Sequence, residues 1–262
     1  MKILVASLTL VCISLVVISL VFTGQSYARI DPETIVGMWL LDEGSGNVAK
    51  DTSGNGHDGE IKGAKWIDGK FKKALEFDGS AHVNAGEVPL PENKVTVVLW
   101  VSIDTSQQWI HIIENGVVEN TWHGGFRLEV GGEGVTYIAI GDGSAYKDNA
   151  GNGIPTGWKY KEWYHLGFTY DGKVARHYHN GDETHTFDSN LDITKGVGTL
   201  IFGSMQGTQR FLEGRIDDVA IFNVVLGKDD MKTIMNKGLF GVSAAVSSSR
   251  KLTTTWSSIK KH

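Results

Sequence analysis

The chain has 262 residues, of which 41% are hydrophobic and 21% are charged, so there is enough apolar material for a hydrophobic core, which argues against overall disorder. Its formal net charge of −5 argues against a nucleic-acid-binding protein, which would present a basic face. Its 33 glycines follow no three-residue period, which excludes a collagen-like chain, and its single cysteine excludes a disulfide-stapled scaffold.

Residues 1–28 are predicted to be a secretory signal peptide. Lys2 provides a positive start, residues 3–22 are almost wholly apolar, and Ser26-Tyr27-Ala28 forms a small-x-small cleavage pattern. We therefore expect cleavage after Ala28, and a mature protein that is secreted or held in the cell envelope without a membrane span. The alternative is an uncleaved N-terminal anchor, because about 20 apolar residues can cross a bilayer.

Ten short β-rich segments, separated by turn residues, are predicted along the rest of the chain. Pairs such as Asp171-Gly172 and Asn180-Gly181 tolerate positive φ and close two-residue hairpins. In residues 95–103 every second side chain is aliphatic, which is typical of a strand with one face in a core. Many short strands at this spacing predict an all-β sandwich or barrel. The expected strands are Ile35–Leu41, Ala74–Phe77, Val95–Ile103, Trp109–Asn115, Phe126–Val130, Val135–Ile140, Trp163–Tyr170, Val174–His179, Thr199–Phe202 and Gly214–Phe222.

One short segment near the C-terminus is predicted to be helical. It begins at Leu226 and carries Met231, Ile234 and Met235 on one side, with Gly238 as the expected stop. Strands and helices do not alternate along the chain, which disfavours a Rossmann fold or a (β/α) barrel.

Residues 241–262 differ in composition from the rest and are predicted to form a tail outside the domain. A Ser-rich stretch leads to a basic end, a pattern typical of a loose terminus. Leu252, Trp256 and Ile259 recur at helical spacing. The alternative is therefore a segment that docks onto the domain or onto a partner.

Several short motifs of the predicted domain occur in a specific order. They are Gly37-Met38-Trp39-Leu40-Leu41-Asp42-Glu43-Gly44-Ser45-Gly46, Asp51-Thr52-Ser53-Gly54-Asn55-Gly56-His57-Asp58-Gly59, Lys73-Ala74-Leu75-Glu76-Phe77-Asp78-Gly79-Ser80, Trp163-Tyr164-His165, Tyr170-Asp171-Gly172, Tyr178-His179-Asn180-Gly181 and Glu213-Gly214-Arg215-Ile216-Asp217-Asp218-Val219. In this order, over about residues 35–240, they resemble the laminin G-like, concanavalin A-like lectin/glucanase superfamily in its bacterial jelly-roll form. The resemblance implies one all-β domain over residues 29–240, a two-sheet antiparallel jelly-roll sandwich. It also implies a secreted, carbohydrate- or protein-binding module, often with one structural calcium ion.

The sequence lacks the carboxylate pattern of an enzyme on this scaffold. Glucanases of the superfamily carry Glu-x-Asp-x-x-Glu on one strand, since retaining cleavage needs two carboxylates about 5–5.5 Å apart. Glu76-Phe77-Asp78 begins such a run, but Gly79-Ser80-Ala81 follows without a second glutamate. Glu114 and Glu119 flank a predicted turn. We therefore expect a non-catalytic module, with a glycoside hydrolase as the less favoured alternative.

Three aspartates at expected strand ends are candidate ligands of a structural calcium ion. The resemblance implies that Asp217 binds the ion, with Asp42 and Asp78 as partners. Calcium takes oxygen ligands, and adjacent carboxylates such as Asp217 and Asp218 repel each other without a cation. The alternative is that Asp217 and Asp42 bond backbone N–H groups at strand ends.

Three histidines are the other candidate metal ligands. His177 and His179 share one face of an expected strand, and His185 lies across the following hairpin. Such a trio can hold zinc. Because no Cys or carboxylate at ligand spacing accompanies them, we expect partly exposed imidazoles on a sheet instead.

The irregular stretches at residues 141–161 and 120–125 are the predicted ligand site. Aromatic rings stack on the C–H face of a sugar, Asn and Asp bond its hydroxyl groups, and long loops are often functional. The alternative is that the aromatics only pin the loop to the sandwich. The predicted partner is an extracellular glycan, or else a surface protein bound by a structural or adhesion module of the cell envelope. The predicted ligand-binding residues are Trp122, Tyr146, Asn149, Trp158 and Tyr160.

Overall fold

The computed structural model describes residues 30–106, 109–116, 123–131, 135–149, 154–155 and 157–241. The chain divides into two units, Met1–Ile30 and Asp31–His262, and the fold given below is that of the second. The predicted signal peptide, Trp122 and residues 242–262 of the predicted tail lie outside the described residues. The expectations for those segments stay predictions.

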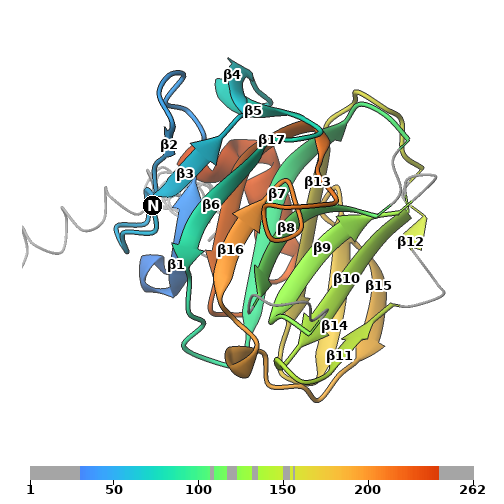
Figure 1. Ribbon diagram of the computed structural model, residues 1–262. Coiled ribbons are helices and arrows are strands. Elements are labelled where there is room, and N and C mark those ends of the chain that lie inside the picture. Colours follow the sequence, from blue (N-terminus) through green and yellow to red (C-terminus); the bar gives the residue numbers. More distant parts are fainter. Residues whose placement is uncertain are drawn as a thin grey trace, which may run out of the picture. The chain divides into compact units, whose positions relative to one another are not determined.

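Two antiparallel β-sheets pack face to face, as the jelly-roll resemblance implies (Figure 1). The eight-stranded sheet has the order β15 (Asp182–Asp188), β14 (Val174–His179), β13 (Tyr164–Tyr170), β7 (Val95–Ile103), β17 (Glu213–Phe222), β5 (Lys73–Asp78) and β4 (Lys65–Asp68), with β1 (Ile35–Trp39) beside β17. The nine-stranded sheet has the order β11 (Tyr146–Asp148), β10 (Val135–Gly141), β9 (Phe126–Val130), β8 (Ile110–Gly116), β16 (Thr199–Phe202), β6 (His82–Glu87), β3 (Gly59–Lys62) and β2 (Val48–Ala49), with β12 (Ile154–Pro155) beside β10. Two short 3-10 helices, η1 (Pro32–Thr34) and η3 (Ile193–Lys195), lie in connections.

The hydrophobic core lies between the two sheets and is built from alternate residues of their strands. On β7, the odd-numbered residues from Val95 to Ile103 belong to it, which confirms the alternation predicted from the sequence. Phe126 of β9 and Phe168 of β13 meet in a T-shaped arrangement, with ring centroids 5.4 Å apart. Such contacts join one sheet to the other.

A helix covers the second face of the eight-stranded sheet. All nine residues of β7 are buried because this face is covered as well as the core face. The helix spans residues 228–241; Met231 packs against Gly167 of β13, and the backbone N–H of Leu239 donates to Asp218. Gly238 has a φ of +68°, a left-handed conformation that interrupts a regular α-helix, and the N–H of Leu239 bonds a side chain instead of a helical carbonyl. The prediction that the regular helix stops at Gly238 is therefore confirmed, and the helical residues after it form one further turn that buries Leu239 completely. In the described part of the chain, no helix is both long and apolar enough to cross a membrane.

The stretch predicted to be a long irregular loop, residues 141–161, contains two short strands. β11 pairs with β10 from Ala139 to Gly141, and β12 pairs with Val135 and Thr136 of the same strand. Both strands have only two or three residues, too few for a periodic pattern in the sequence. They extend the nine-stranded sheet beyond β10.

Candidate functional site

The outer face of the nine-stranded sheet, which points away from the core, carries a buried cluster of charged side chains. At its centre, the ring of His111 on β8 has a carboxylate on each side. Its Nδ1 lies 2.7 Å from Oε2 of Glu114, and its Nε2 lies 3.0 Å from Oε2 of Glu129 on β9. Because only 1% of the His111 side chain is exposed, these carboxylates take the place of water.

A β-bulge sets the geometry of this pair. Residues three apart in a regular strand point to opposite faces of a sheet, yet His111 and Glu114 lie on the same face. The pairing of β8 with β9 shifts between His111 and Ile113, which adds one residue to β8. The extra residue turns Glu114 outward, where it meets the histidine.

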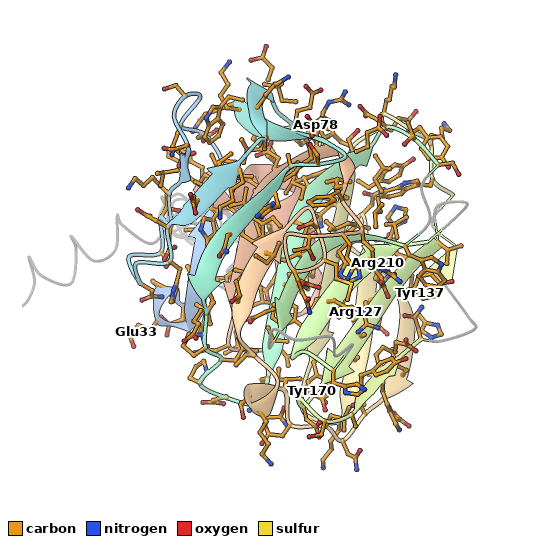
Figure 2. The ribbon with its side chains drawn as sticks, viewed as in Figure 1. Glu33, Asp78, Arg127, Tyr137, Tyr170 and Arg210 are labelled. Carbon is orange, nitrogen blue, oxygen red and sulfur yellow. The ribbon has the colours of Figure 1, made fainter. Side chains whose placement is uncertain are left out.

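Two arginines complete the cluster around Glu129, and Figure 2 labels both of them, Arg127 and Arg210. Nε of Arg127 lies 3.3 Å from Oε1 of Glu129, Nη1 of Arg210 lies 3.8 Å from Oε2, and Asp148 lies 3.8 Å from Arg127. Burial alone would raise the pKa of Glu129, but His111 and Arg127 outweigh it and lower that pKa. Burial alone would lower the pKa of His111, but the two glutamates outweigh it and raise that pKa.

Aromatic rings border the cluster at two ends. Trp109 packs against Tyr137 of β10, with ring centroids 4.9 Å apart, and Arg127 lies 5.0 Å from the centroid of Tyr146. Trp109 is 41% exposed and Tyr146 is 42% exposed. Tyr146 pairs with Gly141, four residues along β10 from Tyr137, so the two ends are roughly 13 Å apart. We refer to Trp109, His111, Glu114, Arg127, Glu129, Tyr137, Tyr146, Asp148 and Arg210 together as the polar face.

The connection from β16 to β17 places Arg210 over the sheet. Its ends are tied by backbone bonds, since the N–H of Gly203 donates to Ile112 and the N–H of Leu212 donates to Gly203. The carbonyl of Arg210 accepts from the N–H of His111, and its guanidinium lies 6.0 Å from the ring centroid of Trp109. The polar face therefore combines residues that are far apart in the sequence.

The structure does not gather the predicted ligand-binding residues into one surface. Tyr146 lies on the polar face. Asn149 is buried, and its side chain bonds two backbone groups of β10. Trp158 stacks on Tyr164 with ring centroids 4.2 Å apart and packs against the core, so it pins its loop to the sandwich. Tyr160, in the same loop, is exposed.

Asp217 of β17 carries a buried carboxyl group with one unsatisfied oxygen. Its Oδ2 accepts a bond of 2.9 Å from the N–H of Phe71, whereas its Oδ1 has no hydrogen-bond partner among the described residues. Burial, reinforced by the nearby carboxylates of Asp218 and Asp42, raises the pKa of Asp217 to about 8, and burial raises that of Asp218 to about 6. The free Oδ1 of Asp217 is an oxygen donor of the kind that a hard cation takes, and a cation beside it would offset the repulsion from the neighbouring carboxylates.

The other two predicted calcium ligands differ in their placement. Asp42 lies close to Asp217, but both of its carboxylate oxygens already accept bonds from lysines. Asp78 pairs with Glu213, four residues along β17 from Asp217, and bonds the following turn at Ser80. Among the described residues, no three His, Cys, Asp or Glu side chains form a group that can hold a metal ion. An ion at Asp217 would therefore take most of its ligands from backbone carbonyls and water.

His177 is buried, which corrects the expectation of a partly exposed imidazole at this position, whereas His179 and His185 are half-buried, as expected. Its Nδ1 lies 2.6 Å from Oγ1 of Thr184, and its Nε2 lies 3.2 Å from Oγ1 of Thr136 on β10. Burial lowers the pKa of His177 to about 3. The neutral ring thus links β14 to the opposite sheet, with both nitrogens engaged by hydroxyl groups.

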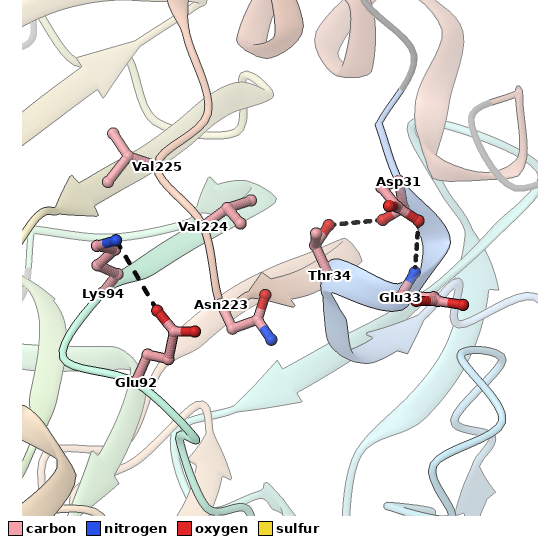
Figure 3. Close-up of a pocket in the computed structure, with 8 residues that line it drawn as sticks. All are labelled: Asp31, Glu33, Thr34, Glu92, Lys94, Asn223, Val224 and Val225. Atoms are coloured by element: carbon pink, nitrogen blue, oxygen red, sulfur yellow. Dashed lines mark hydrogen bonds and ion pairs between the residues drawn. The ribbon is translucent and has the colours of Figure 1, made fainter.

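A recess of about 530 Å³ lies beside η1 (Figure 3). It is lined by Asp31, Glu33, Thr34, Glu92, Lys94, Asn223, Val224 and Val225. Asp31 is engaged in capping η1, and Lys94 lies 3.8 Å from Glu92. No aromatic side chain is among its lining residues in the described chain, so this recess lacks the stacking surfaces of the polar face.

Most residues of the polar face were not predicted from the sequence. One signal was present: Phe126 to Val130 alternates, which places Arg127 and Glu129 on the face opposite the core-facing phenylalanine. The bulge at His111 and the position of Arg210 have no comparable signal, because they depend on strand pairing and on the path of a connection.

The fold and the polar face together define a jelly-roll β-sandwich with an aromatic-bordered surface on one sheet. Residues 77–232 match the family model described as the concanavalin A-like lectin/glucanases superfamily, and the chain belongs to this superfamily. The resemblance carried by the sequence motifs is thereby confirmed. No curated protein matches the chain.

Three solved structures illustrate the shared fold. Domain 4 of AbnA, a GH43 extracellular arabinanase from Geobacillus stearothermophilus solved in complex with arabinotriose, is 20% identical with a TM-score of 0.63, covering 77% of this chain and 98% of that chain. The binding domain of Paraclostridial Mosquitocidal Protein 1 is 16% identical with a TM-score of 0.60, covering 78% of this chain and 52% of that chain. The receptor binding domain of botulinum neurotoxin C/D mosaic serotype is 17% identical with a TM-score of 0.57, covering 79% and 52%. The chain spans about half the length of these two toxin domains, and at such identities the likeness shows the fold alone.

Proposed function

We propose that the protein is a non-catalytic module that binds a neutral glycan on the polar face. The observation that carries the proposal is the pair of exposed aromatic rings, Trp109 and Tyr146, on either side of a floor of paired charges. Aromatic rings stack on the apolar face of a sugar, while carboxylate and guanidinium groups bond its hydroxyl groups. The strand positions beside the two rings are roughly 13 Å apart along the backbone of β10, a spacing that suits a short stretch of an oligosaccharide.

The balance of charges on the polar face supports a neutral ligand. Its basic groups are Arg127, Arg210 and His111, whose pKa is raised by the two glutamates, and its acidic groups are Glu114, Glu129 and Asp148. An anionic ligand would compete with the carboxylates for the arginines, and a cationic ligand would compete with the arginines for the carboxylates. In either case a buried charge would lose its partner, which costs desolvation free energy. A neutral sugar donates to the carboxylates and accepts from the guanidinium groups without leaving a charge unpaired.

The state of the two glutamates supports binding over catalysis. A glycosidase needs one carboxyl group as acid and a second, accessible one as nucleophile or base. Glu129 is 3% exposed and lies against His111 and two arginines, and its pKa is lowered, the opposite of what a general acid needs. Glu114 is engaged by His111 and by the backbone N–H of Gln206.

The similar structures supply the first probe and the second candidate function. The arabinanase domain was solved with arabinotriose, which makes arabino-oligosaccharides the first sugars to try. The toxin domains are receptor-binding or binding domains, which supports the alternative of an adhesion module of the cell envelope that recognises a surface protein.

We also propose that the protein is exported and holds a structural calcium ion. The signal pattern of residues 1–28 supports export to the medium or the envelope. The unsatisfied Oδ1 of Asp217, with Asp218 and Asp42 nearby, supports the calcium ion. The ion, when bound, would neutralise these carboxylates and stabilise the junction of β17 with residues 69–71.

Glycan binding by the wild-type protein and by single variants tests the main proposal. Soluble arabinan, xylan, mannan and β-glucan are titrated into the protein by calorimetry. We expect at least one to bind, and Trp109→Ala and Tyr146→Ala each to weaken that binding tenfold or more, which corresponds to about 1.4 kcal/mol. Tyr160→Ala is the matched control, because Tyr160 is 40% exposed but lies outside the polar face. Absence of binding to every glycan, or weakening by Tyr160→Ala alone, contradicts the proposal.

A further inference from the structure

A recess of about 100 Å³ adjoins the polar face on the outer side of the nine-stranded sheet. It is lined by Asn84, Glu114, Gly116, Thr199, Ile201 and Gln206. Glu114 belongs to both sites: its Oε2 contacts His111 of the polar face, and its Oε1 accepts a bond of 2.6 Å from the backbone N–H of Gln206. A ligand that lies on the polar face therefore reaches the recess past a single side chain.

The register of three strands builds the floor of the recess. Ile201 of β16 pairs with Asn84 of β6 on one side and with Glu114 of β8 on the other. Partners in one cross-strand row point to the same face of a sheet, and the neighbours Leu200 and Phe202 point into the core. The floor is thus an apolar side chain flanked by an amide and a carboxylate.

The turn after β16 builds the wall. Gln206 has a φ of +53°, a left-handed conformation that is energetically unfavourable for a residue with a side chain. Its bond to Glu114 holds it there, and the N–H of the next residue, Gly207, donates to Oγ of Ser204 at 3.0 Å. A Cβ atom at Gly207 would lie 2.8 Å from Nε2 of His82, so glycine allows the turn to sit close to the sheet. The wall is therefore held in place by the fold.

The lining suits a small group that carries several hydroxyls. The amides of Asn84 and Gln206 and the hydroxyl of Thr199 both donate and accept, and the carboxylate of Glu114 accepts. Among the described residues that line the recess, this carboxylate is the one charged group, and it disfavours an anionic ligand. A cavity of roughly 150 Å³ takes a benzene ring, so this smaller recess encloses only one edge of a ring-sized group and leaves the rest of that group outside.

We propose that the recess is a branch subsite, which holds one neutral sugar that projects from a glycan backbone bound on the polar face. The inference rests on the proposed function, because the backbone must first lie between Trp109 and Tyr146. Glu114 links the two sites, since one of its oxygens faces the charged cluster and the other faces the wall of the recess. The recess selects branched glycans over unbranched ones.

Matched pairs of oligosaccharides test this selection. The pairs are fragments of linear and branched arabinan, of linear mannan and galactomannan, and of xylan and arabinoxylan, with equal backbone lengths. Calorimetry with the wild-type protein is expected to show at least tenfold tighter binding of the branched member of the pair that binds. One or two additional hydrogen bonds give a preference of this size.

Two variants connect the preference to the recess. Ile201→Phe fills the recess from its floor and is expected to abolish the preference while binding of the linear member is unchanged. Thr199→Val removes a hydroxyl group at nearly constant shape and is expected to reduce the preference about two- to tenfold. Thr186→Val, at an exposed position on β15, is its matched control.

The outcomes separate the two proposals. Equal affinity for the branched and linear members of every bound pair, or a preference that survives both variants, overturns the branch subsite and leaves glycan binding standing. Failure of the wild-type protein to bind any member overturns the proposed function, and the branch subsite with it. If Ile201→Phe does not fold, as judged by its thermal transition, Thr199→Val decides.

Discussion

Nε2 of His111 on β8 lies 3.0 Å from Oε2 of Glu129 on β9, and the two side chains are 1% and 3% exposed. Neighbouring strands are thus joined on their outer face by a buried ionic contact rather than by apolar packing. Removing two charged groups from water costs free energy, and an apolar pair of similar size often stabilises a protein as much or more. Its position between two exposed aromatic rings therefore favours a role in binding.

Replacing His111 is expected to remove part of the pH dependence of stability. Because its folded pKa is raised, the stabilisation from its pairing is full below the unfolded value of 6.5 and is lost as the pH rises through the folded value. Because the pKa of Glu129 is lowered, its contribution is present above the unfolded value of 4.5 and is lost as the pH falls through the folded value. We expect His111→Gln to cost about 3–5 kcal/mol at mildly acidic pH, since it removes the charged partner that Glu114 and Glu129 share.

Urea unfolding across the acid-to-alkaline range checks this expectation. The wild-type protein should lose stability more steeply than His111→Gln above the unfolded pKa of 6.5. His185→Gln, which changes a half-buried histidine elsewhere, is the control and should keep the wild-type slope. Parallel curves for wild type and His111→Gln would show that the pairing does not contribute.

The Asp217 carboxyl group is expected to destabilise the fold at alkaline pH unless a cation is bound. Its pKa is raised from 3.8 to about 8, and that of Asp218 to about 6. The folded state therefore holds more protons than the unfolded state in this window, so stability falls as the pH rises from 3.8 to about 8. Asp217→Asn removes the ionisation at constant shape and should unfold at higher urea than wild type at alkaline pH in a chelator.

Calcium addition supplies the second part of this test. At alkaline pH, calcium should raise the thermal transition of the wild-type protein and leave that of Asp217→Asn unchanged. Asp78→Asn is a matched control, because Asp78 bonds its own turn away from Asp217. A wild-type transition that calcium does not shift argues against the ion.

Removal of a core aromatic ring is expected to weaken the contact between the sheets. Phe168 is fully buried and packs against Phe126 of the opposite sheet. Phe168→Ala should cost about 3–5 kcal/mol of unfolding free energy, from lost burial and the cavity left behind. Phe240→Ala, at an exposed ring on the C-terminal helix, should cost less than about 1 kcal/mol. Comparable losses in the two variants in urea unfolding would refute the assignment of the core.

Processing of the N-terminus is expected to leave Arg29 as the first residue. Expression in a host with a general secretory pathway, followed by mass measurement of the released protein, determines the cleavage site. Substituting Ala28 with a large charged residue, Ala28→Glu, should block cleavage because the site requires small side chains. A wild-type protein that retains residues 1–28 would support the anchor alternative.

The sequence was sufficient for much of the fold but for little of the site. Residues 95–103 alternate along the strand, so their core face was predicted correctly. β15 was missed because Asp182–Asp188 lies at the edge of its sheet, where exposed polar residues dilute the alternation. The end of the regular helix was predicted correctly, because Gly238 adopts the left-handed φ of +68° that glycine tolerates at a helix C-terminus.

Strands, turns and the identity of the superfamily follow from short-range features: alternation of side chains, glycine-containing turns and ordered motifs. The polar face does not, because its members meet through pairings between distant segments. A one-residue change of register reverses the face to which a side chain points, and one bulge in β8 places Glu114 beside His111. Arg210 reaches the same surface only because the connection from β16 to β17 crosses over it.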